Sequence, residues 1–302
     1  MKSWTKTLLG IGVSCSLLGA SLAGYGLATG GFSDLEDSTS IVGKVSYQKV
    51  SLDSFRKINI DSTTYDVIIS KANIDKPFIS YSDNKKIPVN YDVKNDNTLT
   101  VKQTGGSSKI KNTDIHFFNL KDIIGIAKTG IIENSHTIVI SVPQNTDLTS
   151  IKANLSSGNL DISQLSLNTA TVELLTGELT LTDTTLNSGT IKLSSGDAEV
   201  ENSILKNSTF SITTGDIDLE NSRIADTTFK LNMGDFSGES TIFQSDNTLT
   251  ITTGDVDITL ANKDLTVSTT NVLGDTDITP DLNQSSKNTL TIDGNMGDIS
   301  IQ

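Results

Sequence analysis

Two aspartates in the stretch TTGDIDLENS, residues 213 to 222, are the first residues in this sequence whose type and spacing could do chemistry. Asp216 and Asp218 follow Gly215 as they would in a metal-binding loop or at the rim of an active site. Oxygen ligands of this kind bind Ca²⁺, and carboxylate pairs hydrolyse glycosidic bonds. The other interpretation is that both side chains only form the outer face of a strand. The organisation of the whole chain decides between them.

The stretch belongs to a repeat whose units all begin at a glycine. The gaps between these glycines are 19, 19, 19, 19, 20, 20 and 23 residues. The glycines are Gly158, Gly177, Gly196, Gly215, Gly234, Gly254, Gly274 and Gly297. Apolar residues alternate with polar ones after each glycine, as Ile217 and Leu219 do, and this period of two predicts strands. Asn, Ser and Asp clusters between the strands predict turns.

Short strands that recur every 19 residues bury their apolar sides only by stacking on neighbouring units. We therefore predict an all-β fold: a single-stranded right-handed parallel β-solenoid with about 19 residues per coil, regular over residues 150–302. Equivalent side chains of successive coils then form columns. Asp216 and Asp218 flank an inward Ile217, so both are expected to point to solvent.

The aspartates that follow the glycines are candidate Ca²⁺ ligands. Asp197, Asp216, Asp235 and Asp255 fall in one predicted column, where stacked carboxylates repel one another unless solvent or cations relieve the charge. Calcium-binding β-rolls repeat every nine residues with additional glycines, and this sequence has neither feature. A solvated acidic face is the favoured interpretation, with weak Ca²⁺ binding by these four residues as the alternative. No cofactor is predicted.

Other catalytic constellations find little support in the sequence. The two histidines, His116 and His136, lie outside the regular repeat, and the only arginines are Arg56 and Arg223. Solenoid enzymes that cleave polysaccharides need aspartates clustered with Arg or Lys in a cleft, whereas the carboxylates here recur along a face. We predict that the chain is not an enzyme. A solenoid enzyme acting on cell-wall polysaccharide is the alternative, favoured by a pocket that gathers Arg223 or a histidine with two or more carboxylates.

The charge of the chain argues against nucleic acid as a partner. The formal net charge is −13, and residues 150–302 hold 7 basic and 22 acidic residues. Affinity for nucleic acid comes mainly from Lys and Arg that neutralise phosphates. An acidic surface of this kind attracts cationic partners instead.

Residues 1–32 are predicted to be a membrane anchor, so that an N-terminal transmembrane helix precedes the solenoid. Lys2 and Lys6 precede a run from Leu8 to Phe32 that carries no charge, and about 20 apolar residues suffice to cross a bilayer. The positive charges place the N-terminus in the cytoplasm and residues 33–302 outside, which predicts a single-pass protein of the cell membrane. A signal peptide cleaved near Ala23, giving a secreted protein, is the main alternative. A lipoprotein attached at Cys15, the only cysteine, is a third.

Between the anchor and the repeat lie a linker and a strand-rich lead-in. Residues 33–46 are polar and predict a short tether. Residues 47–149 predict strands outside the glycine register, either irregular first coils or a β-sheet platform. An insertion at 105–135 carries the apolar pairs Phe117 and Phe118, and Ile123 and Ile124. It is interpreted as a loop or short helix packed at the start of the solenoid, or as a contact for a partner through these four residues.

These features together resemble a known family. The strand IVISVP at residues 138–143 introduces repeated units in which Ser or Thr, Gly, and Asp or Asn precede an alternating apolar pattern. Over about residues 50–302 this is similar to the bacterial putative adhesin family, whose β-strand-repeat domain is described as a toast-rack. The resemblance implies a non-enzymatic, envelope-facing domain for adhesion or envelope-stress sensing in Gram-positive bacteria. Its partner would be a cell-envelope component or a neighbouring membrane protein.

Overall fold

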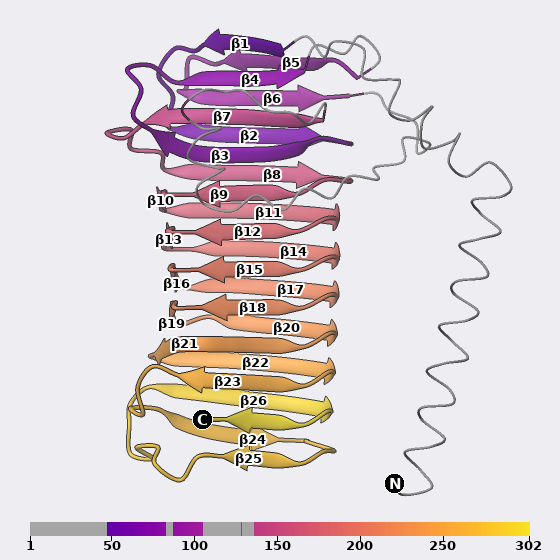
Figure 1. Cartoon of the computed structure of the whole chain (residues 1–302), viewed down its shortest axis with the longest axis vertical. Coiled ribbons are helices and arrows are strands. Elements are labelled where there is room, and N and C mark those ends of the chain that lie inside the picture. The colour runs from indigo at the N-terminus through magenta and orange to yellow at the C-terminus, as the bar shows by residue number, and fades with distance from the viewer. Residues whose placement is uncertain (1–46, 83–86, 105–127, 129–135) are drawn as a thin grey trace, which may run out of the picture. The chain divides into compact units, whose positions relative to one another are not determined.

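The computed structural model describes residues 47–82, 87–104, 128 and 136–302. The predicted anchor and linker, together with His116, Phe117, Phe118, Ile123 and Ile124, lie outside the described residues. Within the described part, no helix is both long and apolar enough to span a membrane. The regular elements of that part are β-strands, stacked as coils one above the other (Figure 1).

Each regular coil contributes one long strand to an eleven-stranded sheet and one or two shorter strands to a sixteen-stranded sheet. The eleven-stranded sheet runs, in spatial order, through β5 (Val89–Val93), β6 (Thr98–Gln103), β2 (Lys57–Ser62), β8 (Ser150–Leu155), β11 (Thr169–Thr176), β14 (Gly189–Ser195), β17 (Ser208–Thr214), β20 (Thr228–Met233), β22 (Asp246–Thr253), β26 (Thr289–Met296) and β24 (Thr266–Thr270).

The sixteen-stranded sheet has a main path and a side ladder that join at β21. The main path contains β1 (Tyr47–Ser51), β4 (Phe78–Ser82), β7 (Thr137–Pro143), β3 (Asp66–Ala72), β9 (Leu160–Ser163), β12 (Leu179–Thr182), β15 (Ala198–Glu201), β18 (Ile217–Glu220), β21 (Phe236–Gln244), β23 (Val256–Leu260), β27 (Ile299–Ile301) and β25 (Thr276–Ile278). The side ladder contains β10 (Ser166–Leu167), β13 (Thr185–Leu186), β16 (Ile204–Lys206) and β19 (Arg223–Ala225).

The pairing of neighbouring coils confirms parallel strands with a register of 19 residues in the middle of the stack. Leu179 of β12 lies beside Leu160 of β9, and Ile217 of β18 beside Ala198 of β15. Because the offset equals the repeat length, residues of the same type fall on top of each other. The columns predicted from the sequence are therefore present.

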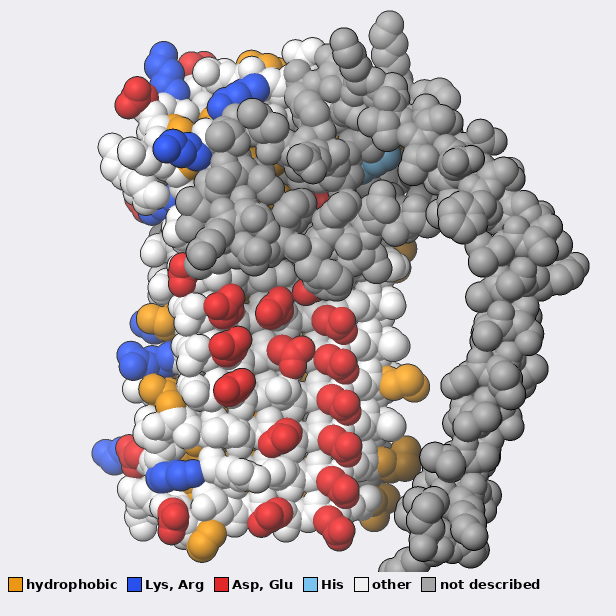
Figure 2. Space-filling view, viewed as in Figure 1, with side chains coloured by type: hydrophobic (Ala, Val, Ile, Leu, Met, Phe, Trp, Pro, Cys, Tyr) orange, Lys and Arg blue, Asp and Glu red, His pale blue; other side chains and the backbone are white. Residues whose placement is uncertain are grey.

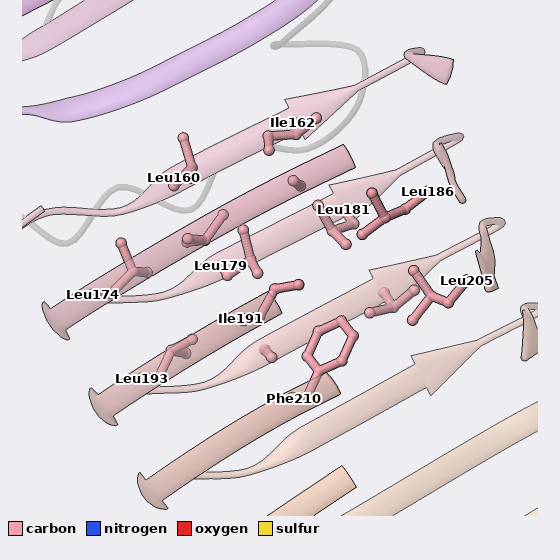
Figure 3. Packing of buried hydrophobic residues seen from close by; sticks show 14 of the residues in the cluster. Leu160, Ile162, Leu174, Leu179, Leu181, Leu186, Ile191, Leu193, Leu205 and Phe210 are labelled. Atoms are coloured by element: carbon pink, nitrogen blue, oxygen red, sulfur yellow. The ribbon is translucent and has the colours of Figure 1, made fainter. Parts of the chain in front are cut away.

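Columns of inward aliphatic and aromatic side chains fill the space between the two sheets (Figure 3). Leu160 and Leu179 belong to one column, and Ile191 and Phe210, which face them from the other sheet, to another. All four are essentially inaccessible to solvent. Burial of each such side chain contributes roughly 1.5–3 kcal/mol to the free energy of unfolding. The buried side chains of successive coils belong to one cluster, so the stack has one continuous hydrophobic core.

The coils at both ends of the stack do not follow the order of the chain. The coil of β2 and β3 lies between the coil of β6 and β7 and that of β8 and β9. The coil of β26 and β27, last in the chain, lies between the coil of β22 and β23 and that of β24 and β25. The lead-in thus consists of coils that continue the solenoid, with β1, β4 and β5 attached in antiparallel pairs.

Candidate functional site

Three columns of carboxylates cover the outside of the sixteen-stranded sheet, and we call them the acidic face (Figure 2). The first column follows the glycine turns and contains Glu178, Asp197, Asp216, Asp235, Asp255, Asp298 and Asp275. The second contains Asp161, Glu199, Asp218, Asp257 and Asp277. The third contains Glu201, Glu220 and Glu239. No Lys or Arg occupies a position in these columns from residue 159 onward.

The glycine turn places each aspartate of the first column. Gly215 has a φ of 138°, a conformation that L side chains rarely adopt. A Cβ on Gly215 would also lie 2.1 Å from the carbonyl oxygen of Gly196 in the neighbouring coil. The turn therefore requires glycine for both its backbone angle and its close approach, and the residue after it, Asp216, is held at the edge of the coil.

Aspartates of the first column bind the next coil through their side chains. The Oδ1 of Asp197 accepts a hydrogen bond of 2.8 Å from the backbone N–H of Asp216. Asp216 accepts one of 2.7 Å from Asp235, and Asp235 one of 2.8 Å from Asp255. The series continues from Asp255 to Asp298 and from Asp298 to Asp275. Asp216 therefore has a structural role, because its side chain joins two neighbouring coils.

The structure brings the four candidate Ca²⁺ ligands, Asp197, Asp216, Asp235 and Asp255, into one column as predicted. One oxygen of each of the first three is already bound to the neighbouring coil, and Asp255 binds Asp298 in the same way. Across residues 47–82, 87–104 and 136–302, no group of three or more His, Cys, Asp or Glu side chains is arranged to hold a metal ion. The solvated acidic face stays the prediction, and weak Ca²⁺ binding by this column stays its untested alternative.

Burial and crowding raise the pKa of several carboxyls on the acidic face. Asp161 is only 8% exposed, and burial raises its pKa to about 7, with Asp66 and Glu178 adding repulsion. Burial also raises the pKa of Glu178 to about 7, helped by the nearby Glu199. The pKa values of Glu199 and Asp218 are raised by burial first and by neighbouring carboxylates second. The face therefore takes up protons more readily than isolated carboxylates do.

The remaining residues singled out from the sequence do not meet in one place. His136 stacks edge-on against Tyr65, with ring centroids 5.6 Å apart, and burial lowers its pKa. Arg223 begins β19 in the side ladder and is exposed. Neither residue lines the cavity bounded by Phe55, Arg56 and Asp147 or the cavity bounded by Asp61, Glu173 and Lys192.

One cavity that the sequence did not predict gathers charged side chains of both signs. It has a volume of about 440 Å³ and is lined by three loops, at residues 52–56, 75–77 and 143–147. Arg56 and Lys76 lie there together with three aspartates, Asp53, Asp75 and Asp147. No sequence motif predicts this cavity, because its walls come from segments that are far apart in the chain.

The stacked parallel coils define the chain as a repeat protein of the β-solenoid type. Over residues 55–302 it matches the family described as Toastrack DUF4097, and the chain belongs to this family. The resemblance seen in the sequence is thereby confirmed. Curated proteins gave no match.

Several solved structures are similar to the chain at low sequence identity. A putative lipid binding protein from Parabacteroides distasonis is 12% identical, with 85% of this chain and 97% of that chain covered and a TM-score of 0.49. A putative adhesin from Bacteroides fragilis is 15% identical, with 86% and 98% covered and a TM-score of 0.46. A putative cell adhesion protein from Clostridium sporogenes is 14% identical, with 85% and 99% covered and a TM-score of 0.26.

Proposed function

We propose that this chain is a non-enzymatic binding module of the cell envelope, which acts in adhesion or in envelope-stress sensing and scaffolding. Its N-terminal segment holds it at the outer side of the cell membrane, and its solenoid meets a cell-envelope component or a neighbouring membrane protein. Membership of the Toastrack DUF4097 family supports a module of this kind. The names of similar structures, which include an adhesin and a cell adhesion protein, point in the same direction.

The observation that carries the proposal is the length and regularity of the acidic face. Its columns run over successive coils, and strands of adjacent coils lie about 4.7–4.9 Å apart. A rigid array of like charges attracts a cationic partner over long range and loses its own repulsion when the partner binds. Burial raises the pKa values of Glu199 and Asp218 first, and repulsion from neighbouring carboxylates raises them further. A basic segment of an envelope protein therefore fits this surface.

The acidic face suits binding better than catalysis. A catalytic site needs one singular constellation, with a nucleophile or base held beside groups that stabilise the transition state. The columns instead repeat the same side chains from coil to coil. The cavity near Arg56 is the one observation that favours the alternative, a solenoid enzyme acting on cell-wall polysaccharide, because it places aspartates beside Arg and Lys.

Retention of the full-length protein on cell-envelope fractions tests the proposal. The variant Glu199→Gln/Asp218→Asn/Asp257→Asn removes three charges from the second column and is expected to lose at least about ten-fold in retention, as suits an electrostatic contact. The control variant Asp92→Asn/Asp96→Asn/Asp226→Asn removes the same charge outside the acidic face. Equal retention of the two variants would contradict a role for this face. Release of reducing sugar from wall polysaccharide would favour the enzyme.

A further inference from the structure

The cavity at residues 52–56, 75–77 and 143–147 arises from the coil order at the start of the solenoid. After β7 the chain passes the coil of β2 and β3 to reach β8, so the loop between β7 and β8 crosses the ends of that coil. The loops are tied together by backbone hydrogen bonds. Leu52 N–H donates to Pro77 O at 2.8 Å, and Thr149 N–H donates to Arg56 O at 2.7 Å. The walls of the cavity are therefore preformed.

The cavity combines an apolar floor with a polar rim. Leu52 and Phe55 are 8% and 2% exposed, and Pro77 and Pro143 beside them are also buried. The rim consists of exposed polar and charged side chains. These include Asp53, Asp75, Lys76 and Asn145, together with Arg56, whose guanidinium pairs with Asp147.

The balance of charge on the rim argues against a ligand held by charge alone. Because Arg56 and Asp147 neutralise each other, Asp53 and Asp75 remain opposite one cation, Lys76. Two carboxylates disfavour a phosphate or a polyanion, and the Lys and Arg disfavour a polycation. The same groups supply many directional hydrogen bonds, since carboxylates accept, the ammonium donates and the amide of Asn145 does both.

A ligand that matches this surface has hydroxyls around its edge and an apolar C–H face. We propose that the cavity binds a short neutral glycan, about two or three sugar units long. Its C–H face lies over the part of the floor formed by Leu52, Pro77 and Pro143, and its hydroxyls bind Asp75 and Asn145. The volume of about 440 Å³ is within the usual range of small-ligand sites. This site is distinct from the acidic face and does not depend on the envelope-binding role proposed for it.

Calorimetric titration of the full-length protein, in a detergent without a sugar head group, tests the proposal. The probes are cellotriose, chitotriose and maltotriose, with trigalacturonate and the glucosamine trimer as charged counterparts. At least one neutral trisaccharide is expected to bind with a Kd on the order of 1 mM or tighter. Its Kd is expected to change less than about two-fold between low and high salt, because no net charge is neutralised.

Matched variants locate the site. Asp75→Asn and Asn145→Ala are expected to weaken binding at least about ten-fold, the loss of one or two hydrogen bonds to a polar ligand. Both positions are exposed, so their melting temperatures should stay near that of the wild type. Asp257→Asn on the acidic face makes the same change as Asp75→Asn and is expected to leave the Kd unchanged.

Four outcomes would overturn the proposal. The first is that no neutral trisaccharide binds up to about 20 mM, a concentration well above the expected Kd. The second is binding that is confined to a charged trimer and abolished by salt, and the third is binding that Asp75→Asn and Asn145→Ala leave intact. The fourth is cleavage of a probe. Failure here is distinguishable from failure of the envelope-binding proposal. The triple variant in the second column of the acidic face keeps the cavity and should still bind the glycan.

Discussion

Gly254 and Gly297 lie against each other in adjacent coils, although they are 43 residues apart in the sequence. A Cβ on Gly297 would be 1.9 Å from the carbonyl oxygen of Gly254, and the N–H of Gly254 donates to Met296 O at 3.0 Å. Gly274 in turn meets Gly297, with 2.1 Å from its would-be Cβ to the Gly297 oxygen. The coil of β26 and β27 therefore lies between the coil of β22 and β23 and the coil of β24 and β25.

This arrangement predicts the effect of deleting residues 289–302. The deletion removes β26 and β27, the strands on which β24 and β25 are paired. Residues 266–278 should then lose amide protection in hydrogen exchange, while β22 and β23 keep their partners β20 and β21 and stay protected. Removal of Gln302 alone serves as the control. Protection of 266–278 in the deletion variant would show that β24 and β25 can pair directly with β22 and β23.

The sequence predicted the middle of the solenoid well because local pattern and long-range contact coincide there. Where the repeat is a constant 19 residues, each glycine finds the glycine one unit away, so the inward positions of Ile217 and Leu219 were predicted correctly. At the two ends of the solenoid, the spacing of the glycines predicts where each turn lies in the sequence. It does not predict which coil that turn stacks on. Gly274 and Gly297 have the same local pattern, and nothing in either motif states which of them contacts Gly254.

The candidate site was predicted in its columns but not in its contacts. Alternation correctly placed Asp216 and Asp218 on the outer face, yet the hydrogen bond from Asp235 N–H to Asp216 becomes visible only when the coils are stacked. Burial of Asp161 was not predictable, since its position in the repeat equals that of the exposed Asp218. The cavity at Arg56 depends on loop contacts across about 90 residues, which no local pattern reports.

Substitution by alanine should destabilise the protein at Gly215 but not at Gly238. Gly215→Ala places a Cβ 2.1 Å from Gly196 O at a φ of 138°, which costs at least about 1–3 kcal/mol of unfolding free energy. Gly238 has ordinary backbone angles, and its Cβ would meet Ile258 and Thr241 at 3.4 Å. Gly238→Ala is therefore expected to be neutral or stabilising by up to about 1 kcal/mol, because it restricts the unfolded chain.

Urea denaturation of both variants measures this difference, and Thr214→Val is a third comparison. Thr214 is exposed next to Gly215, so its replacement should change stability by less than about 0.5 kcal/mol. Equal denaturation midpoints for Gly215→Ala and Gly238→Ala would refute the close approach of coils at the glycine turn.

The stability of the solenoid should fall as the pH rises toward neutrality. Burial raises the pKa of Asp161 to about 7 in the folded protein, against 3.8 for an unperturbed aspartate. Between these values the folded state holds a proton that the unfolded state has released, so the free energy of unfolding decreases with increasing pH. Asp161→Asn should flatten the dependence of melting temperature on pH from about 4 to 7. Asp92→Asn should keep the slope of the wild type, and an unchanged slope in Asp161→Asn would contradict the assignment.

Calcium should not stabilise the first column of the acidic face beyond the effect of ionic strength. Asp197, Asp216 and Asp235 each use one oxygen to accept a backbone N–H of the next coil, which leaves an incomplete ligand set for a cation that takes six to eight oxygens. We expect equal melting temperatures in CaCl₂ and in NaCl of matched ionic strength. A higher melting temperature with Ca²⁺ than with Mg²⁺ would show cation binding, since a bound ion stabilises by mass action.

The predicted anchor leads to an expectation about where the acidic face lies relative to the membrane. Lys2 and Lys6 precede 25 uncharged residues, which predicts a single-pass segment with its N-terminus inside and the solenoid outside. An anionic lipid surface repels the acidic face, so we expect the coils to project outward, where cationic partners are within reach. Full-length protein with a C-terminal tag, expressed in a Gram-positive host, allows the topology to be measured by protease treatment of intact protoplasts. Loss of the tag, with a cytoplasmic marker left intact, is the expected result. A tag that is protected from protease until lysis would show that the solenoid lies inside the cell. A tag found in the medium without protease would show that residues 1–32 are cleaved as a signal peptide.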